Sequence, residues 1–319
     1  MFQGLLLSQI RKKNASKSII EEISKALDIS YDAAHRRANL KSKISLDESV
    51  LLANYFGLSL DSLFGQANHG FISIQRTPQI HNENQLEEYL KGSYKSLKKI
   101  LNKKTAKVFY SAKDIPVFHL LKSKELCRFK IYLWLNSFSK DKDSNPFHKF
   151  YPKLSTVQVI NDLIGLYYQV SVSEIWDITT INSLLKQVYI FFKKGKIAVK
   201  EAIILCDSLK IVLKEIVSKA VLSNNNYRLY QNELLLVNNN VLICNEYERA
   251  LFVPSGMLSY FKTKDEEICD RALKYFDKQT ENSRSLDTYT EIDQDLFYKT
   301  LVKKIEVLIR LLKDEKTCA

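Results

Sequence analysis

One stretch, residues 18–43, constrains the fold more than any other part of the chain; it reads SIIEEISKALDISYDAAHRRANLKSK. Apolar residues recur at spacings of three and four over its first half, which predicts an amphipathic helix. Asp28-Ile29-Ser30 predicts a tight turn, and Ser30 is a favourable N-cap for a second helix over Ser30–Asn39. Ala34 and Ala38 lie one turn apart in that helix and are small enough for close packing against the first.

The residues on either side extend this pair into a unit of five helices. Residues 5–13 predict a preceding helix, and Ser18 with Glu21 has the spacing of a capping box. Ser45 and Glu48 repeat that spacing before a helix over Leu46–Phe56. We expect Gly57 to end this helix and Leu60–Phe64 to form a short fifth one, and we expect the inward-facing residues of the fourth helix to include Leu46, Val50, Ala53 and Tyr55 or Phe56.

The order of these elements resembles the Cro/repressor-type (XRE-like) helix-turn-helix domain of bacterial and phage regulators. The resemblance covers about residues 5–65 and is closest in LDESVLLANYFGLSLDSLF. Asp28 and Leu40 stand where that family usually has glycine, and Arg37 stands where an apolar residue is common. The resemblance implies that the helix over Ser30–Asn39 reads the DNA major groove.

The polar residues of the helix over Ser30–Asn39 and of the loop after it supply the chemistry for such contacts. An arginine can bond guanine at O6 and N7, whereas lysine and serine mainly hold phosphates. A net charge of +12 also fits a polyanionic partner, although a lysine-rich composition alone would give the same balance. The candidate DNA-binding residues are Ser18, Ser30, Tyr31, Asp32, His35, Arg36, Arg37, Lys41 and Lys43. The alternative is that Arg36 and Arg37 are solvated charges on a protein-binding domain.

Beyond the helix-turn-helix domain, predicted for residues 1–66, residues 67–84 predict a linker and 85–319 a mainly α-helical body, with a sub-boundary near residue 224. Gly 8 and Pro 5 are low counts, which favours helices. We expect helices over 85–103, 123–138, 155–170, 179–194, 198–222, 263–279 and 292–313. A small β-hairpin or three-stranded meander is expected within 227–254, from Glu233–Val237, Val241–Cys244 and Arg249–Val253.

The sequence favours no enzyme class, no metal and no cofactor. Titratable residues such as Asp114, His119, His148, Glu174 and Asp177 belong to no nucleophile elbow, phosphate loop or metal-ligand pattern. The 5 cysteines are scattered, as in a reducing compartment. No apolar run approaches the ~20 residues of a membrane span. We therefore expect a soluble, cytoplasmic protein.

The sequence predicts a DNA-binding transcriptional regulator with double-stranded DNA as its partner and a body that forms a homodimer. The alternative is a helical module that binds a protein or peptide without specific DNA binding. The body could also sense an effector, since its aromatic residues could line a cavity, but core packing explains the same helical spacing. The aromatic residues that could line such a cavity are Tyr167, Tyr168, Trp176, Tyr189, Phe191 and Phe192. Neither the operator nor the effector follows from the sequence.

Overall fold

The protein consists of two compact units, a head (Met1–Ile74) and a body (Gln75–Ala319). The computed structural model describes residues 2–14, 18–60, 63, 74–75, 77, 80–138, 146–222, 226–232 and 238–317. The division between the units falls within the range 67–84 that the sequence predicts as a linker.

The head contains α1 (Phe2–Lys13), α2 (Ile19–Leu27), α3 (Tyr31–Ala38) and α4 (Leu46–Phe56). These agree with the first four predicted helices, whereas the predicted fifth helix, 60–64, falls mostly outside the described residues. The buried residues that hold the head together come from all four helices and are Leu6, Leu7, Ile10, Ile23, Ala34, Ala38 and Leu52.

Among four local predictions for the head, two are confirmed, one is wrong and one is partly correct. The Ser45–Glu48 capping box is present, and Gly57 ends α4 in the left-handed conformation. Ser18 makes no side-chain capping hydrogen bond, so the predicted box with Glu21 is wrong. Of the residues expected to face inward from α4, Ala53 is buried and Phe56 packs against the core, whereas Leu46 and Val50 are 78% and 42% exposed. Leu52 is buried in their place.

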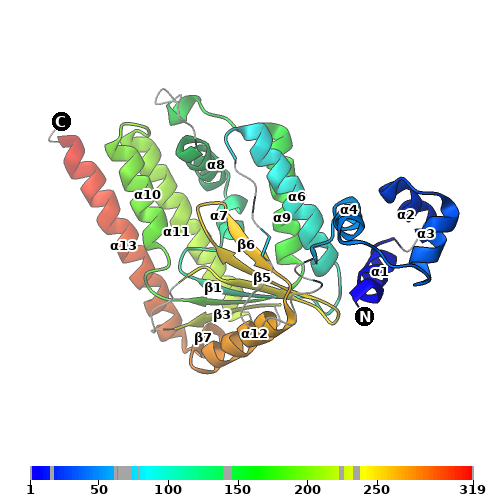
Figure 1. The fold of residues 1–319 in the computed structure, drawn as a ribbon. Coiled ribbons are helices and arrows are strands. Elements are labelled where there is room, and N and C mark those ends of the chain that lie inside the picture. The colour runs from blue at the N-terminus through cyan, green and yellow to red at the C-terminus, as the bar shows by residue number, and fades with distance from the viewer. Residues whose placement is uncertain are drawn as a thin grey trace. The chain divides into compact units, whose positions relative to one another are not determined.

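The body is built on a 7-stranded mixed sheet with the order β6-β5-β4-β1-β2-β3-β7 (Figure 1). β1, β2 and β3 are parallel, and β4, β5, β6 and β7 join antiparallel. The mainly α body with a small hairpin is therefore a wrong prediction. The strands are β1 (Lys107–Ala112), β2 (Ser171–Trp176), β3 (Tyr227–Gln231), β4 (Val241–Cys244), β5 (Arg249–Pro254), β6 (Tyr260–Thr263) and β7 (Arg284–Ser285).

The sequence missed β1 and β2 because they are short and most of their residues on both faces are buried. Such strands have no alternation of apolar and polar residues that would distinguish them from a buried helix or a connection. β4 and β5 were predicted correctly, while Glu233–Val237 falls outside the described residues. Because β4 pairs with β1, the sheet joins strands from before and after residue 224.

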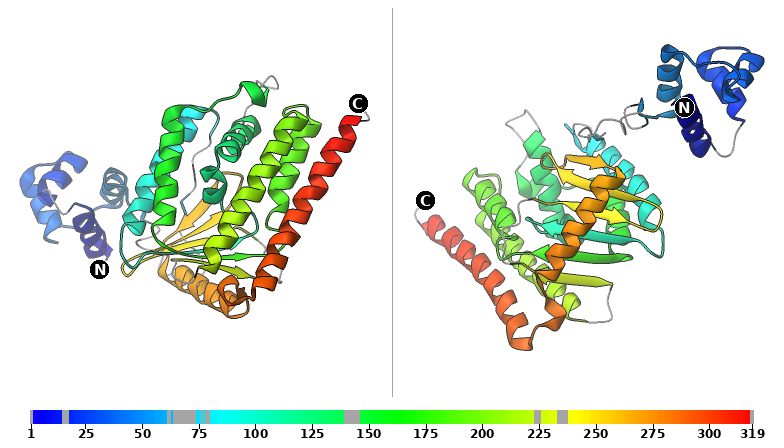
Figure 2. Two further views of the ribbon diagram at one scale, coloured as in Figure 1. Left: turned by 180° about the vertical axis from the view of Figure 1, so that it is seen from behind. Right: turned by 60° about the horizontal axis from the view of Figure 1, so that its bottom comes forward.

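Helices cover both faces of the sheet, with α12 (Glu266–Glu281) on one face and the other long helices of the body on the opposite face (Figures 1 and 2). The predicted helices of the body agree with the observed ones within a few residues. The short helix α7, which precedes α8, was not predicted. The helices opposite α12 are α6 (Glu83–Leu101), α7 (Val117–Lys122), α8 (Lys124–Phe138), α9 (Leu154–Tyr168), α10 (Asn182–Lys193), α11 (Val199–Val221) and α13 (Glu291–Thr317), and two short 3₁₀ helices are η2 (Phe147–Lys149) and η3 (Leu286–Thr288).

Strand register assigns alternate side chains to two different cores. Tyr110, Val241, Phe252 and Lys262 are cross-strand partners in one row over β1, β4, β5 and β6. The side chains one position along belong to the opposite face, since successive residues of a strand alternate. These include Phe109, Leu242 and Leu251, which pack with Cys269 and Phe276 of α12.

Candidate functional site

Helix α1 holds the C-terminal ends of α3 and α4 through three polar side chains. Gln3 Nε2 donates to the carbonyls of Arg37 and Ser42, at 3.2 and 2.9 Å, and Gln3 Oε1 accepts from Ile44 N at 3.2 Å. Arg11 donates to the Ala38 carbonyl at 3.0 Å, and Lys13 to the carbonyls at the end of α4. These contacts satisfy backbone carbonyls that a helix end leaves without partners. They hold α3 and its following loop against α1.

Helix α3 buries one face and exposes the residues that the sequence selected for DNA contact. Ala34 and Ala38 are 0% and 2% exposed, as their small size predicted. Tyr31, Asp32 and Arg36 are exposed, and His35 is partly buried. Lys25 forms an ion pair with Glu22, and Arg37 forms one with Glu48.

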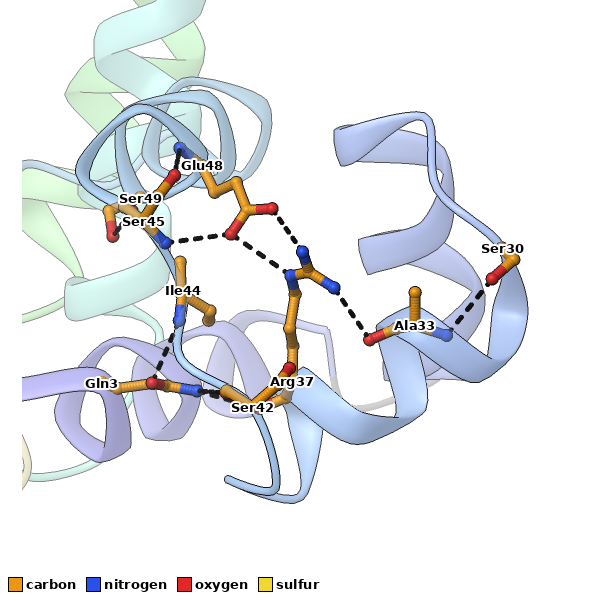
Figure 3. Close-up of polar contacts among 9 residues, drawn as sticks. All are labelled: Gln3, Ser30, Ala33, Arg37, Ser42, Ile44, Ser45, Glu48 and Ser49. Atoms are coloured by element: carbon orange, nitrogen blue, oxygen red, sulfur yellow. Dashed lines mark hydrogen bonds and ion pairs between the residues drawn. The ribbon is translucent and has the colours of Figure 1, made fainter.

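Arg37 differs from its neighbour Arg36 because its guanidinium already has protein partners (Figure 3). Nη2 and Nε donate to the two carboxylate oxygens of Glu48 at 2.7 and 3.2 Å, and Nη1 donates to the Ala33 carbonyl at 3.3 Å. Both side chains of the pair are 21% exposed. The hydrogen bond from Arg37 lowers the pKa of Glu48 and outweighs burial, which acts in the opposite direction.

The remaining predicted DNA-binding residues lie at the helix starts and in the loop after α3. Ser30 caps α3, its hydroxyl accepting from Ala33 N at 3.3 Å, whereas Ser18 is exposed at the start of α2. Lys41 and Lys43 are exposed. They follow Leu40, which has a left-handed φ of 60°. The structure thus brings Arg36, Lys41 and Lys43 to the surface of the head near one end of α3.

The body contains a cavity of about 860 Å³ that the sequence did not identify. The floor is the face of the sheet that carries the row Tyr110, Val241, Phe252 and Lys262. Helices α6, α7, α8, α9 and α10 contribute the walls. Of the six aromatic residues proposed for a cavity, Tyr167 lines it. Most of the remaining lining side chains are apolar.

Lys130 of α8 is an unusual member of this lining. Its Nζ donates to Gln187 Oε1 at 3.1 Å and lies 5.9 Å from the centre of the Trp134 ring. Burial lowers the pKa of this ammonium to about 8, and the negative charge of Asp114 opposes only part of the shift. Among the described residues no carboxylate forms an ion pair with it. No sequence pattern indicates a special role for Lys130, because α8 is apolar around most of its surface.

A second group of buried polar residues adjoins the cavity at Tyr167. Glu174 of β2 is 0% exposed and accepts hydrogen bonds from His119 Nε2 at 2.7 Å, Trp176 Nε1 at 2.8 Å and the Tyr227 hydroxyl at 2.9 Å, and also from the Tyr167 hydroxyl. Burial raises the pKa of this carboxyl, but the electrostatic interaction with His119 and these hydrogen bonds outweigh it, so the pKa lies below its usual value.

The structure therefore brings together two of the five titratable residues noted in the sequence, His119 and Glu174. Asp114 instead pairs with Asn239, and Asp177 accepts from Thr179. His148 lies in η2. Within the described residues no group of three or more His, Cys, Asp or Glu side chains could hold a metal ion. The His119–Glu174 network has the saturated hydrogen bonding of a structural group.

The chain matches no known family model, no curated protein and no solved structure. The resemblance to Cro/repressor-type domains thus stays a prediction from the residues of the head. None of the helices in the described ranges combines the length and apolar character that crossing a membrane requires.

Proposed function

We propose that the chain is a sequence-specific DNA-binding transcriptional regulator in which α3 enters the major groove. The observation that carries the proposal is the division of α3 into a buried alanine face and an exposed face with Tyr31, Asp32 and Arg36. A recognition helix needs this division, because one side must pack on the domain while the other reaches base edges.

Within this proposal, the two adjacent arginines have different roles. Arg36 is the residue for bidentate contact with guanine, and Lys41 and Lys43 bind phosphates. Arg37 positions α3 through Glu48, so its effect on DNA is indirect. A homodimer formed through the body would place two copies of α3 one DNA turn apart, ~34 Å.

The test is fluorescence-anisotropy titration of the full chain with fragments of its own upstream region, at several salt concentrations and with random competitor DNA. Arg36→Ala should weaken specific binding about 10- to 100-fold and relax the preference at one base pair. Arg271→Ala on α12 is the matched control, since its side chain is 71% exposed and the same charge is lost in the other unit. Equal affinity of the Arg36 and Arg271 variants would contradict the proposal.

A second candidate function is supported by exposed apolar residues on the head. Leu46, Val50, Leu51 and Tyr55 of α4 are between 42% and 78% exposed. A cluster of this kind is typical of a protein-docking surface. An interaction module would bind its partner with little salt dependence, whereas phosphate-driven DNA binding falls linearly on a log–log salt plot. The salt titration therefore separates the two functions.

A further inference from the structure

The cavity of the body has the size and lining of a small-molecule site. Its volume of about 860 Å³ lies within the ~300–1,000 Å³ of ligand pockets, which are mostly apolar with a few polar anchors. Leu97 and Leu101 of α6, Leu163 of α9 and Phe252 of β5 are among its apolar side chains. An extended hydrocarbon chain would replace water along these surfaces.

The polar anchor on the wall is Lys130 together with Gln187. The ammonium of the partly buried Lys130 has no ionic partner among the described residues, and its lowered pKa reflects the cost of holding an uncompensated charge away from water. An anion placed beside it would compensate the charge, and the Gln187 amide could donate a second hydrogen bond to the same group. The cavity therefore favours a negatively charged group at the Lys130 end.

The other charged residues of the lining are already engaged or exposed. Asp114 accepts from Asn239 Nδ2 at 3.3 Å, and Lys262 donates to Ser96 Oγ at 2.7 Å. Glu88 is exposed on α6. A single ammonium matches a single negative charge, whereas a phosphate dianion would leave part of its charge buried without compensation.

We propose that this cavity binds a monocarboxylate with an extended apolar tail, the carboxylate on Lys130 and Gln187 and the tail over the sheet row of Val241 and Phe252. The inference concerns the body alone and does not depend on DNA binding by the head.

The first test is isothermal titration calorimetry of the full chain with dodecanoate, kept below its micelle concentration, and with dodecanol. Dodecanoate should bind with one site per chain and at least tenfold more tightly than dodecanol. In the series octanoate, decanoate and dodecanoate, affinity should rise about fourfold for each added methylene. Absence of saturable binding, or equal binding of acid and alcohol, would overturn the proposal.

Two variants locate the site. Lys130→Met should remove the preference for dodecanoate over dodecanol, whereas Lys91→Met, an exposed lysine of α6 outside the cavity, should preserve it. Leu97→Trp fills part of the cavity with a larger side chain, so it should weaken the binding of dodecanoate more than that of octanoate. An unchanged acid preference in a folded Lys130→Met protein, checked by circular dichroism, would contradict the assigned anchor.

Tryptophan emission gives a readout that is independent of affinity. The chain has 2 tryptophans, and Trp134 lines the cavity whereas Trp176 does not. Dodecanoate should shift the emission of the wild-type protein but not that of Trp134→Phe. A shift that persists unchanged in this variant would place the ligand elsewhere and overturn the proposal.

Discussion

The carboxylate of Glu48 holds the guanidinium of Arg37 and, through the same side chain, accepts from the backbone N–H of Ser45 at 2.9 Å (Figure 3). One carboxylate therefore joins the last turn of α3 to the first turn of α4. Both contacts are charge-assisted, which makes them stronger than hydrogen bonds between neutral groups. Arg37 stabilises the placement of α3, and Arg36 remains at the surface beside it.

The first prediction separates these two arginines by stability. Arg37→Ala should destabilise the head by about 1–3 kcal/mol, because it leaves the Glu48 carboxylate without its cation. Arg36→Ala should change stability by less than about 0.5 kcal/mol, as expected for an exposed side chain. Hydrogen exchange of the α2 and α3 amides in the full chain measures both effects. Equal protection in the two variants would disprove the positioning role of Arg37.

The second prediction concerns Leu40, which has a left-handed backbone conformation and a side chain that is 61% exposed. Leu40→Gly should stabilise the head by about 0.5–1 kcal/mol, because it removes a side-chain clash and costs little packing. Asp28→Gly is the comparison, since Asp28 has a similar φ of 52°. It should gain less, because aspartate tolerates this conformation better than leucine. Hydrogen exchange of the α3 amides should become slower in Leu40→Gly.

The third prediction concerns Glu174, whose pKa is lowered from an ordinary value of 4.5. The carboxylate therefore stabilises the fold above pH 4.5, and this contribution is lost as the pH falls through the folded-state value. Glu174→Gln should cost on the order of 3 kcal/mol at neutral pH, because it leaves buried donors poorly matched. The difference from wild type should shrink below pH 4.5.

Chemical denaturation of both proteins across pH 3–7 measures this difference. Glu215→Gln is the matched control, since its ion pair with Lys122 is solvent-exposed and contributes little. A wild-type advantage that stayed constant down to pH 3 would show that ionisation of Glu174 is not its source.

The fourth prediction concerns Lys130, whose pKa is lowered from 10.5 to about 8. Between these values the unfolded chain binds more protons than the folded one, so this lysine makes stability rise with pH over that range. Lys130→Met should abolish the rise and stabilise the body by about 1–3 kcal/mol at pH 7.

Carboxylate binding should have the opposite pH dependence. Binding requires the ammonium, so dodecanoate affinity should fall above about pH 8. The decrease should approach tenfold for each pH unit. The other titratable groups of the lining are Glu88, Tyr89, Tyr110, Asp114, Tyr167, Tyr260 and Lys262. Calorimetry in buffers of different ionisation enthalpy measures the accompanying proton uptake. Affinity that is constant from pH 7 to 10 would exclude Lys130 as the anchor.

The sequence determined the helices of both units because their signals are local. The Ser45–Glu48 box, the Ser30 cap and the small residues Ala34 and Ala38 lie within a few positions of the backbone they organise. The apolar run of β4 was likewise readable as a strand. The exposed candidates Tyr31, Asp32 and Arg36 followed from the same helical periodicity.

Tertiary structure alone decided how these elements meet. The parallel pairing of β1 with β2 joins residues more than 60 positions apart, and no local pattern encodes that contact. The roles of Arg37, Glu174 and Lys130 depend on which partners the fold brings within hydrogen-bond distance. Periodicity tells which face of an element is buried, whereas the pairing of charges and the space left between elements arise only when all the layers pack together.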